Sequence, residues 1–129
     1  MFRPDLKTGE LINNRRLMDI FHCACEGGIR YSSKTGTVVL VINNTKTGLP
    51  NTVEGSEISF AGRILKNGYS GANKRLKEFL EQKQPVFLFV VNRPGEYEFL
   101  GQVQLAGAIE LRKTEKGEAY PVFPLKLNI

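Results

Sequence analysis

Two short runs of apolar residues most constrain what this chain can fold into. Residues 37–42 read TVVLVI and residues 85–91 read PVFLFVV, so each run stays apolar over consecutive positions. Because successive side chains of a strand point to opposite faces of a sheet, a strand of this kind must be buried on both faces. The sequence therefore predicts two interior strands. A chain of 129 residues can bury roughly two-thirds of the surface that it exposes when unfolded.

Further strands are predicted around these two runs. Apolar alternation and turn residues indicate strands at 29–32, 97–109 and 119–127, and another that contains Ile58 and Phe60. Pro121 and Pro124 place the last strand at a sheet edge or at bulged positions, because proline has no backbone N–H to donate. Residues 43–55 are rich in Asn, Thr, Gly and Pro, which predicts a long loop.

Two segments have helical spacing. Asn13 can cap the first helix, and the glycine pair at 27–28 is predicted to end it. Ser70 can cap the second helix. The apolar faces consist of Leu17, Ile20 and Phe21 in the first helix and of Leu76, Phe79 and Leu80 in the second.

Strands outnumber helices, so the predicted fold class is α+β. We expect a small curved β-barrel or half-barrel with two helices packed on it. The sequence has no internal repeat, low-complexity tract or linker, which predicts a single domain over residues 1–129, with residues 1–12 as a leading arm.

The charge balance favours anionic partners. The chain has 18 Lys and Arg residues against 13 Asp and Glu residues, a net charge of +5. This excess is compatible with nucleic acid but does not by itself select it. There is no apolar run of about 18 residues and no signal-peptide pattern at the start, so we expect a cytoplasmic protein that does not enter a membrane.

No known catalytic pattern is present in the sequence. The single histidine, His22, excludes an HNH-type nuclease site and an H-E-x-x-H site. His22, Cys23 and Cys25 lie too close in sequence to converge on one zinc ion. Glu81 and Lys83 match half of a nuclease motif, but Glu81 falls in a predicted helix. We therefore expect no catalytic residues, no metal site and no cofactor.

The densest group of chemically informative residues lies between residues 57 and 83. There, a strand that ends near Phe60 leads into a glycine-containing loop and then into a helix whose first turns carry Lys74, Arg75 and Lys77. A strand aromatic, a basic loop and a helix N-terminus suit a phosphate backbone with a base beside it. The alternative is an ordinary strand, loop and helix with solvated lysines.

Four sequence blocks, in this order, resemble SRA (SET- and RING-associated) domains, especially those at the front of bacterial restriction endonucleases that carry an HNH nuclease. No single block is specific, but together they extend over most of residues 13–127. The blocks are INNRRLMDIF with EGGIRYS, VVLVINNTK, EISFAGRILK with GANKRL, and PVFLFVVNRPGEYEFLGQVQLAG with VFPLKL.

The resemblance implies a PUA-like barrel that binds double-stranded DNA and flips a modified cytosine, usually 5-methylcytosine or a related base, into a pocket. By this resemblance, Phe60 is the pocket aromatic, because FAG stands where the family typically reads Tyr-Thr-Gly; the alternative is a core phenylalanine. Asn43, Asn44 and Thr45 lie in the matching loop and would bind the polar edge of the base. Eukaryotic members use an acidic residue there, so the identity of the accepted base stays open.

The same resemblance assigns DNA contacts to the basic loops. Lys74 would bind a phosphate and Asn73 would hold the loop, with helix capping as the alternative for Asn73. Arg63, Lys66 and Tyr69 would follow the backbone or fill the gap left by the flipped base, unless they are merely exposed. The complete set of DNA-binding candidates is Lys46, Arg63, Lys66, Tyr69, Asn73 and Lys74.

These features predict the specificity module of a modification-dependent restriction system. The module would itself be non-catalytic and would work with an HNH-type nuclease domain or subunit. Two alternatives stay open at this point: an RNA-binding PUA-like domain, and a protein-interaction domain that binds no nucleic acid.

Overall fold

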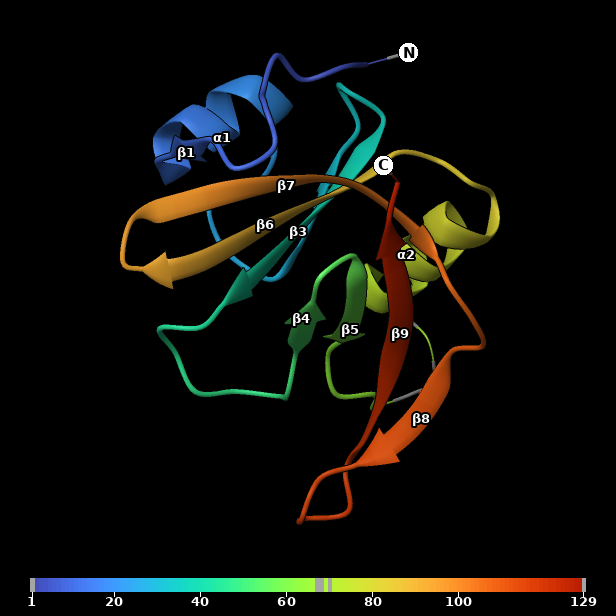
Figure 1. The fold of residues 1–129 in the computed structure, drawn as a ribbon. Helices are drawn as coiled ribbons and strands as arrows, with labels where there is room; N and C mark the ends of the chain where they lie inside the picture. The colour runs from blue at the N-terminus through green and yellow to red at the C-terminus, as the bar shows by residue number, and fades with distance from the viewer. Residues whose placement is uncertain (1, 67–68, 70, 129) are drawn as a thin grey trace.

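The computed structural model describes residues 2–66, 69 and 71–128. Figure 1 shows how the strands and the two helices of these residues are arranged. The elements are β1 (Leu11–Ile12), α1 (Asn14–Phe21), β2 (Ile29–Ser32), β3 (Thr37–Asn43), β4 (Thr52–Glu54), β5 (Glu57–Ala61), α2 (Gly71–Glu81), β6 (Val86–Arg93), β7 (Glu96–Leu105), β8 (Glu110–Lys113) and β9 (Ala119–Leu127).

The strands form one strongly curved sheet in the order β2-β3-β6-β7-β9-β5-β4, with β1 added to β7 and β8 added to β9. Only the β3–β6 pair is parallel among the described strands. The sheet has two halves, β2-β3-β6-β7 and β7-β9-β5-β4. Strand β7 belongs to both, because it pairs with β6 along its first part and with β9 at its end. The two halves cross at a steep angle in Figure 1.

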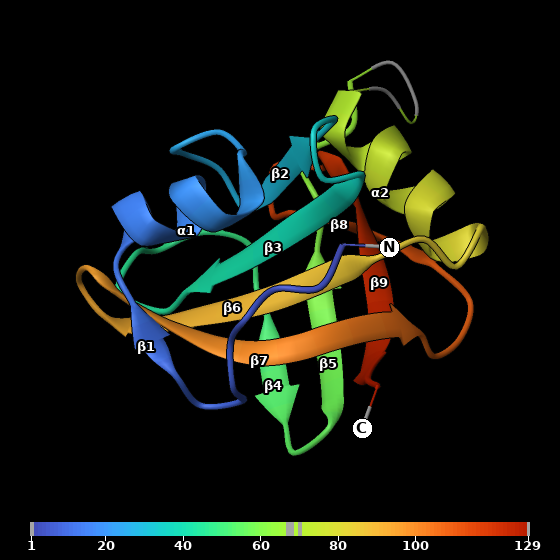
Figure 2. The same cartoon turned by 90° about the horizontal axis from the view of Figure 1, so that it is seen from above.

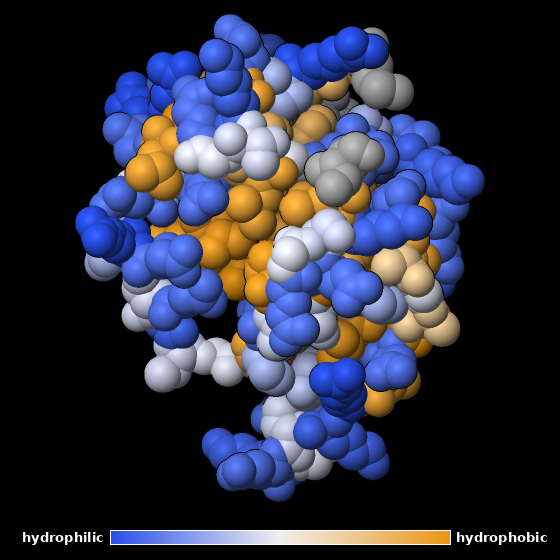
Figure 3. All heavy atoms as spheres, viewed as in Figure 1, coloured by the Kyte–Doolittle hydropathy of each residue, from blue (hydrophilic) through white to orange (hydrophobic). Residues whose placement is uncertain are grey.

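The predicted α+β class with two packed helices is confirmed, but the sheet is not a closed barrel. Strands β2 and β4 end the described sheet without pairing to each other. Figure 3 shows apolar residues gathered at the centre of the face seen in Figure 1, between the upper and lower strands, with hydrophilic residues around them. The apolar interior therefore reaches the surface between the two halves.

The two apolar runs are β3 and β6, and both are buried on both faces as predicted. In β3, Val38, Leu40 and Ile42 point into one core, whereas Val39 and Val41 point into another. Strand β6 divides in the same way. We call the first the inner core, because the concave sheet and α2 enclose it, and the second the outer core, because α1 covers it.

One helix covers each core. Leu17 and Phe21 of α1 are fully buried in the outer core, and Leu76 and Leu80 of α2 are buried in the inner core. Figure 2 shows α1 beside β3 and the N-terminal segment crossing β6 and β7. In this segment, apolar side chains pack on the outer core and β1 pairs with β7. The residues predicted as a leading arm thus lie against the sheet. Neither described helix is long and apolar enough to cross a membrane.

Helix α1 ends earlier than predicted. It stops at Phe21, and His22 follows in the left-handed conformation with φ of 55° and donates its N–H to the Met18 carbonyl. The glycine pair at 27–28 therefore does not end the helix. Residues 22–28 form a loop instead, whose carbonyls accept hydrogen bonds from the side chains of Asn14 and Arg30. The cap predicted for the second helix, Ser70, lies outside the described residues.

Three strands were not predicted: β1, which lies in the residues expected to form a leading arm, β4 and β8. Residues 52–54 of the predicted long loop form β4, and the predicted strand 97–109 ends at Leu105, after which β8 begins at Glu110. Every residue of β4 and β8 is exposed. Because alternating hydrophobicity arises from burial on one face, strands without a buried face leave no such pattern in the sequence.

Strand β9 lies inside the sheet, so the edge or bulged position predicted from its prolines is wrong. It pairs with β5 on one side and with β7 and β8 on the other. The N–H and C=O of one residue in an antiparallel strand point to the same side. The Pro124 carbonyl accepts from Ala106, just beyond β7, and the Pro121 carbonyl accepts from Gly62, just beyond β5. Each proline thus faces a place where the neighbouring strand has already ended.

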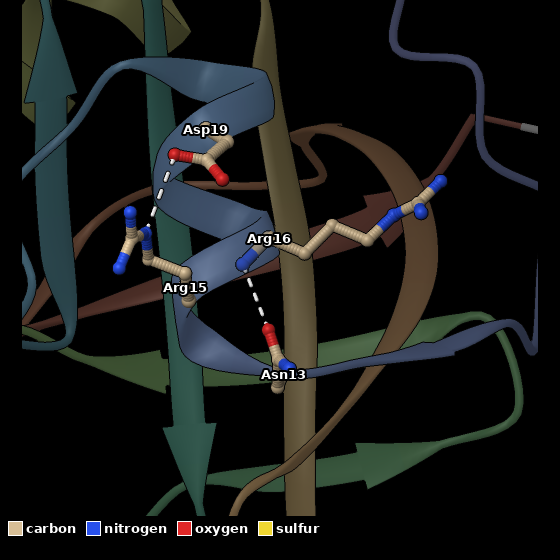
Figure 4. Close-up of polar contacts among 4 residues, drawn as sticks. All are labelled: Asn13, Arg15, Arg16 and Asp19. Atoms are coloured by element: carbon tan, nitrogen blue, oxygen red, sulfur yellow. Dashed lines mark hydrogen bonds and ion pairs between the residues drawn. The ribbon is translucent and has the colours of Figure 1, made fainter.

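The cap of α1 gives a first prediction. The Asn13 side chain accepts a hydrogen bond of 2.8 Å from the Arg16 N–H, as Figure 4 shows. Replacing Asn13 with Ala removes this acceptor and should lower the free energy of unfolding by about 1 kcal/mol, measured by urea denaturation. The control is Arg15→Ala, which removes an ion pair to Asp19 between side chains that are 84% and 68% exposed. It should cost less than about 0.5 kcal/mol, and equal losses would contradict the prediction.

Candidate nucleic-acid interface

Two neighbouring cavities lie at the end of β3. The first, which we call the inner cavity, has a volume of about 280 Å³ and is lined by Gly28, Asn43, the loop 46–51 and the segment 60–63. The second, the outer cavity, has a volume of about 410 Å³ and is lined mainly by residues 25–28, Arg30 and Tyr97. Phe60 belongs to the inner core and Tyr97 packs on the outer core, so the cavities border opposite faces of the sheet. They share Gly28, Asn43 and Lys46.

A third cavity, beside Lys83, has a volume of only about 150 Å³, and two others suit an anion less well. One is lined by Glu96 and Glu98, and another by Glu54 and Glu57. Pairs of carboxylates repel phosphate groups. In contrast, no carboxylate lines the inner cavity, and Lys46 and Arg63 both border it. The end of β3 is therefore the electrostatically favourable place for a nucleotide.

The four predicted base-pocket residues do not all face the inner cavity. Asn43 and Phe60 line it, whereas Asn44 and Thr45 do not. The Asn44 side chain donates to the Asn92 side chain at 2.8 Å. Thr45 donates both its backbone N–H and its hydroxyl to Asn43 Oδ1, which holds the Asn43 side chain in place. Thr45 thus acts on the cavity through Asn43.

Phe60 is a core residue whose ring borders the cavity. Its side chain is only 2% exposed, and it lies opposite Phe123 in the β5–β9 pair. A Cβ atom on Gly28 would lie 3.8 Å from Phe60 Cζ, so the glycine leaves the end of the ring open to the cavity. The cavity also depends on Asn51, which was not predicted: its side-chain oxygen accepts from the Ala61 N–H at 2.7 Å and ties the loop to β5.

Asn73 holds the strand end and the helix together. Its side chain is 3% exposed, and its amide accepts from the Arg63 N–H and donates to the Arg63 carbonyl, both at 2.8 Å. The helix can approach this closely because residue 62 is glycine. A Cβ atom on Gly62 would lie 2.6 Å from Asn73 Oδ1 and 2.8 Å from Pro121 Cγ.

This clamp directs the Arg63 side chain across the molecule toward the loop that precedes β2. Arg63 Nη2 lies 2.9 Å from the position that a Cβ atom on Gly27 would occupy. The guanidinium therefore stands between the strand that carries Phe60 and the glycine pair. Lys46 reaches the same region from the opposite loop, since it lines both cavities.

The other predicted DNA-binding residues lie away from the cavities. Lys66 and Lys74 are exposed, and neither borders the inner or the outer cavity. Tyr69 is half-buried against the inner core, with Lys77 Nζ 5.6 Å from the centre of its ring. Lys74 lies near the start of α2, and Lys66 lies in the segment between β5 and α2. The roles of these three residues in binding stay predictions.

Arg30 is the charged residue that the sequence reasoning missed. It is only 4% exposed, and its Nε donates to the Gly27 carbonyl at 2.9 Å. Its Nη1 donates to Asn14 Oδ1 at 2.7 Å. The signal was present, because Arg30 is the one charged residue of the predicted strand 29–32 and lies two positions after Gly28.

The cysteines and the histidine do not gather into a metal site. Within the described residues, no group of three His, Cys, Asp or Glu side chains is placed to hold a metal ion. His22 is the residue that ends α1, Cys25 is exposed, and Cys23 packs on the outer core. Burial raises the pKa of the Cys23 thiol, and the nearby Arg30 guanidinium opposes this shift.

The curved sheet and its two helices have the fold of SRA domains. The chain superposes on the SUVH5 SRA domain solved with methylated CHH DNA with a TM-score of 0.75, at 16% identity over 96% of this chain and 90% of that one. The DNA recognition domain of the cytosine modification-dependent restriction endonuclease LpnPI gives 0.70, at 16% identity over 99% and 76%.

A third similar structure is the DNA modification-dependent restriction endonuclease AspBHI. The TM-score is 0.66, at 16% identity over 86% of this chain. The chain covers 66% of the AspBHI chain, just under two-thirds of its length. No protein-family model matches the sequence, and neither does any curated protein.

The Asn73 clamp gives a second prediction. Asn73→Ala would leave the Arg63 N–H and carbonyl without their partners, and it should lower the free energy of unfolding by about 2 kcal/mol in urea denaturation. Lys74→Ala, an exposed change at the next position of α2, is the matched control and should stay within about 0.5 kcal/mol of the unaltered protein. A loss at Asn73 no greater than that at Lys74 would show that the clamp does not stabilise the fold.

Proposed function

We propose that this chain binds double-stranded DNA and recognises a modified cytosine, 5-methylcytosine or a related base, which it flips out of the duplex into the inner cavity. The observation that carries the proposal is the cavity itself. On an SRA fold, it opens where Asn43 and Phe60, two residues assigned to the base from sequence, come together. Among the similar structures, SUVH5 SRA was solved with methylated and with hydroxymethylated CG DNA.

The size of the inner cavity suits a single base. Its volume of about 280 Å³ falls just below the range of about 300–1,000 Å³ that is usual for drug-sized ligands. Extruding a base costs a few kcal/mol of lost stacking and pairing, which contacts in the cavity must offset. Phe60 and Asn43 both line the space that such a base would occupy.

The polar groups of the cavity limit which edge of the base can bind. Asn43 Oδ1 already accepts two hydrogen bonds from Thr45, whereas Nδ2 donates to no described group. A free amide donor suits an acceptor on the base, such as the O2 or N3 atom of cytosine. Because no carboxylate lines the cavity, the exocyclic amine must find a neutral acceptor such as a backbone carbonyl.

Cationic residues around the cavity are placed to hold the DNA strand. Lys46 and Arg63 stand at the cavities, Lys66 is exposed in the segment before α2, and Lys74 is exposed in α2 itself. Contacts of this kind fix the position of the duplex without reading its sequence. They also make binding depend on salt, because each neutralised phosphate releases counterions.

In this proposal, residues 1–129 act as one non-catalytic module of a modification-dependent restriction system. An HNH-type nuclease, either a further domain of a longer polypeptide or a separate subunit, would cut the DNA. The likeness to AspBHI and to the DNA recognition domain of LpnPI supports this role.

Fluorescence anisotropy tests the proposal on one duplex that carries cytosine, 5-methylcytosine, 5-hydroxymethylcytosine or glucosylated cytosine at a single site. At least one modified duplex should bind about tenfold more tightly than the unmodified one, and every affinity should fall as salt rises. A structured RNA of equal length is the control and should bind more weakly. Equal affinity for the four duplexes, or tighter binding of the RNA, would overturn the proposal.

Two variants separate base recognition from strand binding. Phe60→Leu keeps an apolar side chain in the core but removes the aromatic ring, so it should lower the preference for the modified base by about tenfold. It should leave the salt-dependent binding in place. Lys74→Gln should weaken all duplexes about equally and reduce the salt slope by about 1. If Phe60→Leu folds normally and retains the preference, Phe60 serves the core alone.

A further inference from the structure

Arg30 is a buried charge whose partners are all neutral. Its hydrogen bonds go to the carbonyls of Gly27 and Ala24 and to the side-chain oxygen of Asn14. No described carboxylate lies within ion-pair distance of it. Arginine is almost never this deeply buried without an opposite charge, because desolvating the guanidinium is costly. A buried guanidinium held by neutral oxygens keeps its full charge available to an anion.

One nitrogen of Arg30 is left for that anion. Nε and Nη1 make these hydrogen bonds, and the guanidinium also lies near the Cys23 thiol and 5.8 Å from the centre of the Tyr97 ring. Nη2 has no oxygen partner among the described residues. Among the described residues, every fully buried side-chain nitrogen or oxygen has a hydrogen-bond partner. Nη2 is therefore the atom that remains accessible, and Arg30 lines the outer cavity.

The backbone beside Arg30 offers further donors. The N–H groups of Gly27 and Gly28 donate to no described acceptor, and Gly27 has a left-handed φ of 98°. Successive free N–H groups near a left-handed residue form a concave site that attracts anions. Their carbonyls are occupied instead, by Arg30 Nε at Gly27 and by the Val41 N–H at Gly28.

Two more cations approach the same glycines. Lys46 lines the outer cavity, and Arg63 Nη2 lies beside Gly27. Neither makes an ion pair with a described carboxylate. Glu26 is the one described carboxylate at this cavity; it is exposed and also unpaired. Three cations and two backbone donors thus outweigh one exposed carboxylate.

We propose that the outer cavity binds a phosphate of the DNA strand next to the flipped nucleotide, with Arg30 and the Gly27–Gly28 N–H groups as its main donors. This inference rests on the proposed function and adds the group that anchors the extruded nucleotide. The two cavities are adjacent, since they share Gly28, Asn43 and Lys46. A nucleotide whose base lies in the inner cavity would therefore have its phosphate group beside the outer cavity. Arginine and backbone N–H groups are well suited to phosphate oxygens.

The test uses duplexes with one modified cytosine and a single neutral methylphosphonate, placed 5′ or 3′ of that cytosine or several nucleotides away. One of the two adjacent substitutions should weaken binding by about tenfold relative to the distant one, the loss expected for a charged hydrogen bond. Arg30→Gln and Lys46→Gln should each make binding less sensitive to that substitution. Arg112→Gln, an exposed change on β8, is the control and should leave the sensitivity unchanged.

Arg30 also holds the 22–28 loop through its bonds to the Gly27 and Ala24 carbonyls, so replacing it can disturb that loop. An independent measurement therefore uses the unaltered protein. Titration with inorganic phosphate should shift the amide NMR signals of Gly27 and Gly28 more than those of Gly36 and Gly117, which lie in other turns. No selective shift overturns the anion site. Unaltered affinity for both adjacent methylphosphonates, with the preference for the modified base retained, overturns the phosphate assignment alone. Loss of that preference overturns the proposed function, even where phosphate still shifts Gly27 and Gly28.

Discussion

The two-sided burial of β3 and β6 is the constraint on which the rest of the structure depends. These parallel neighbours place alternate side chains in the inner and outer cores, so each face needs its own cover. Helix α1 covers one face, and the far half of the sheet with α2 covers the other. A strand covered on both faces leaves only its ends free for binding. The carboxyl end of β3 is where Asn43 emerges and where both cavities open.

The helix α2 fixes the wall of the inner cavity through Asn73. Asn73 bonds both backbone groups of Arg63, so the position of the helix and the direction of the Arg63 side chain are fixed together. This arrangement requires glycine at residue 62, where any side chain would collide with Asn73 and Pro121. Packing of α2 on the inner core and the geometry of the cavity mouth are therefore coupled. A loop that would otherwise be adaptable becomes a preorganised wall of the cavity.

Much of the fold could be predicted from the sequence, and the misses concern features that depend on contacts with distant parts of the chain. The interior strands, the strand at 29–32 and the cap at Asn13 follow from periodicity and capping preference, which act locally. Strands β4 and β8 were missed because they bury nothing. Pro121 and Pro124 misled because their tolerance depends on where neighbouring strands end. For the site, residue type indicated Asn43 and Phe60 but not the direction in which Asn44 points, which its bond to Asn92 decides.

The placement of charges separates groups that serve binding from groups that serve stability. The described ion pairs, Arg15–Asp19, Lys77–Glu81 and Arg112–Glu110, connect neighbouring side chains on single elements and lie away from the end of β3. Surface pairs of this kind contribute little to folding. The unpaired cations Arg30, Lys46 and Arg63 converge on one glycine pair instead. Like charges brought together without counterions destabilise the unbound protein, and a polyanion that enters this site relieves the repulsion, which makes binding favourable and dependent on salt.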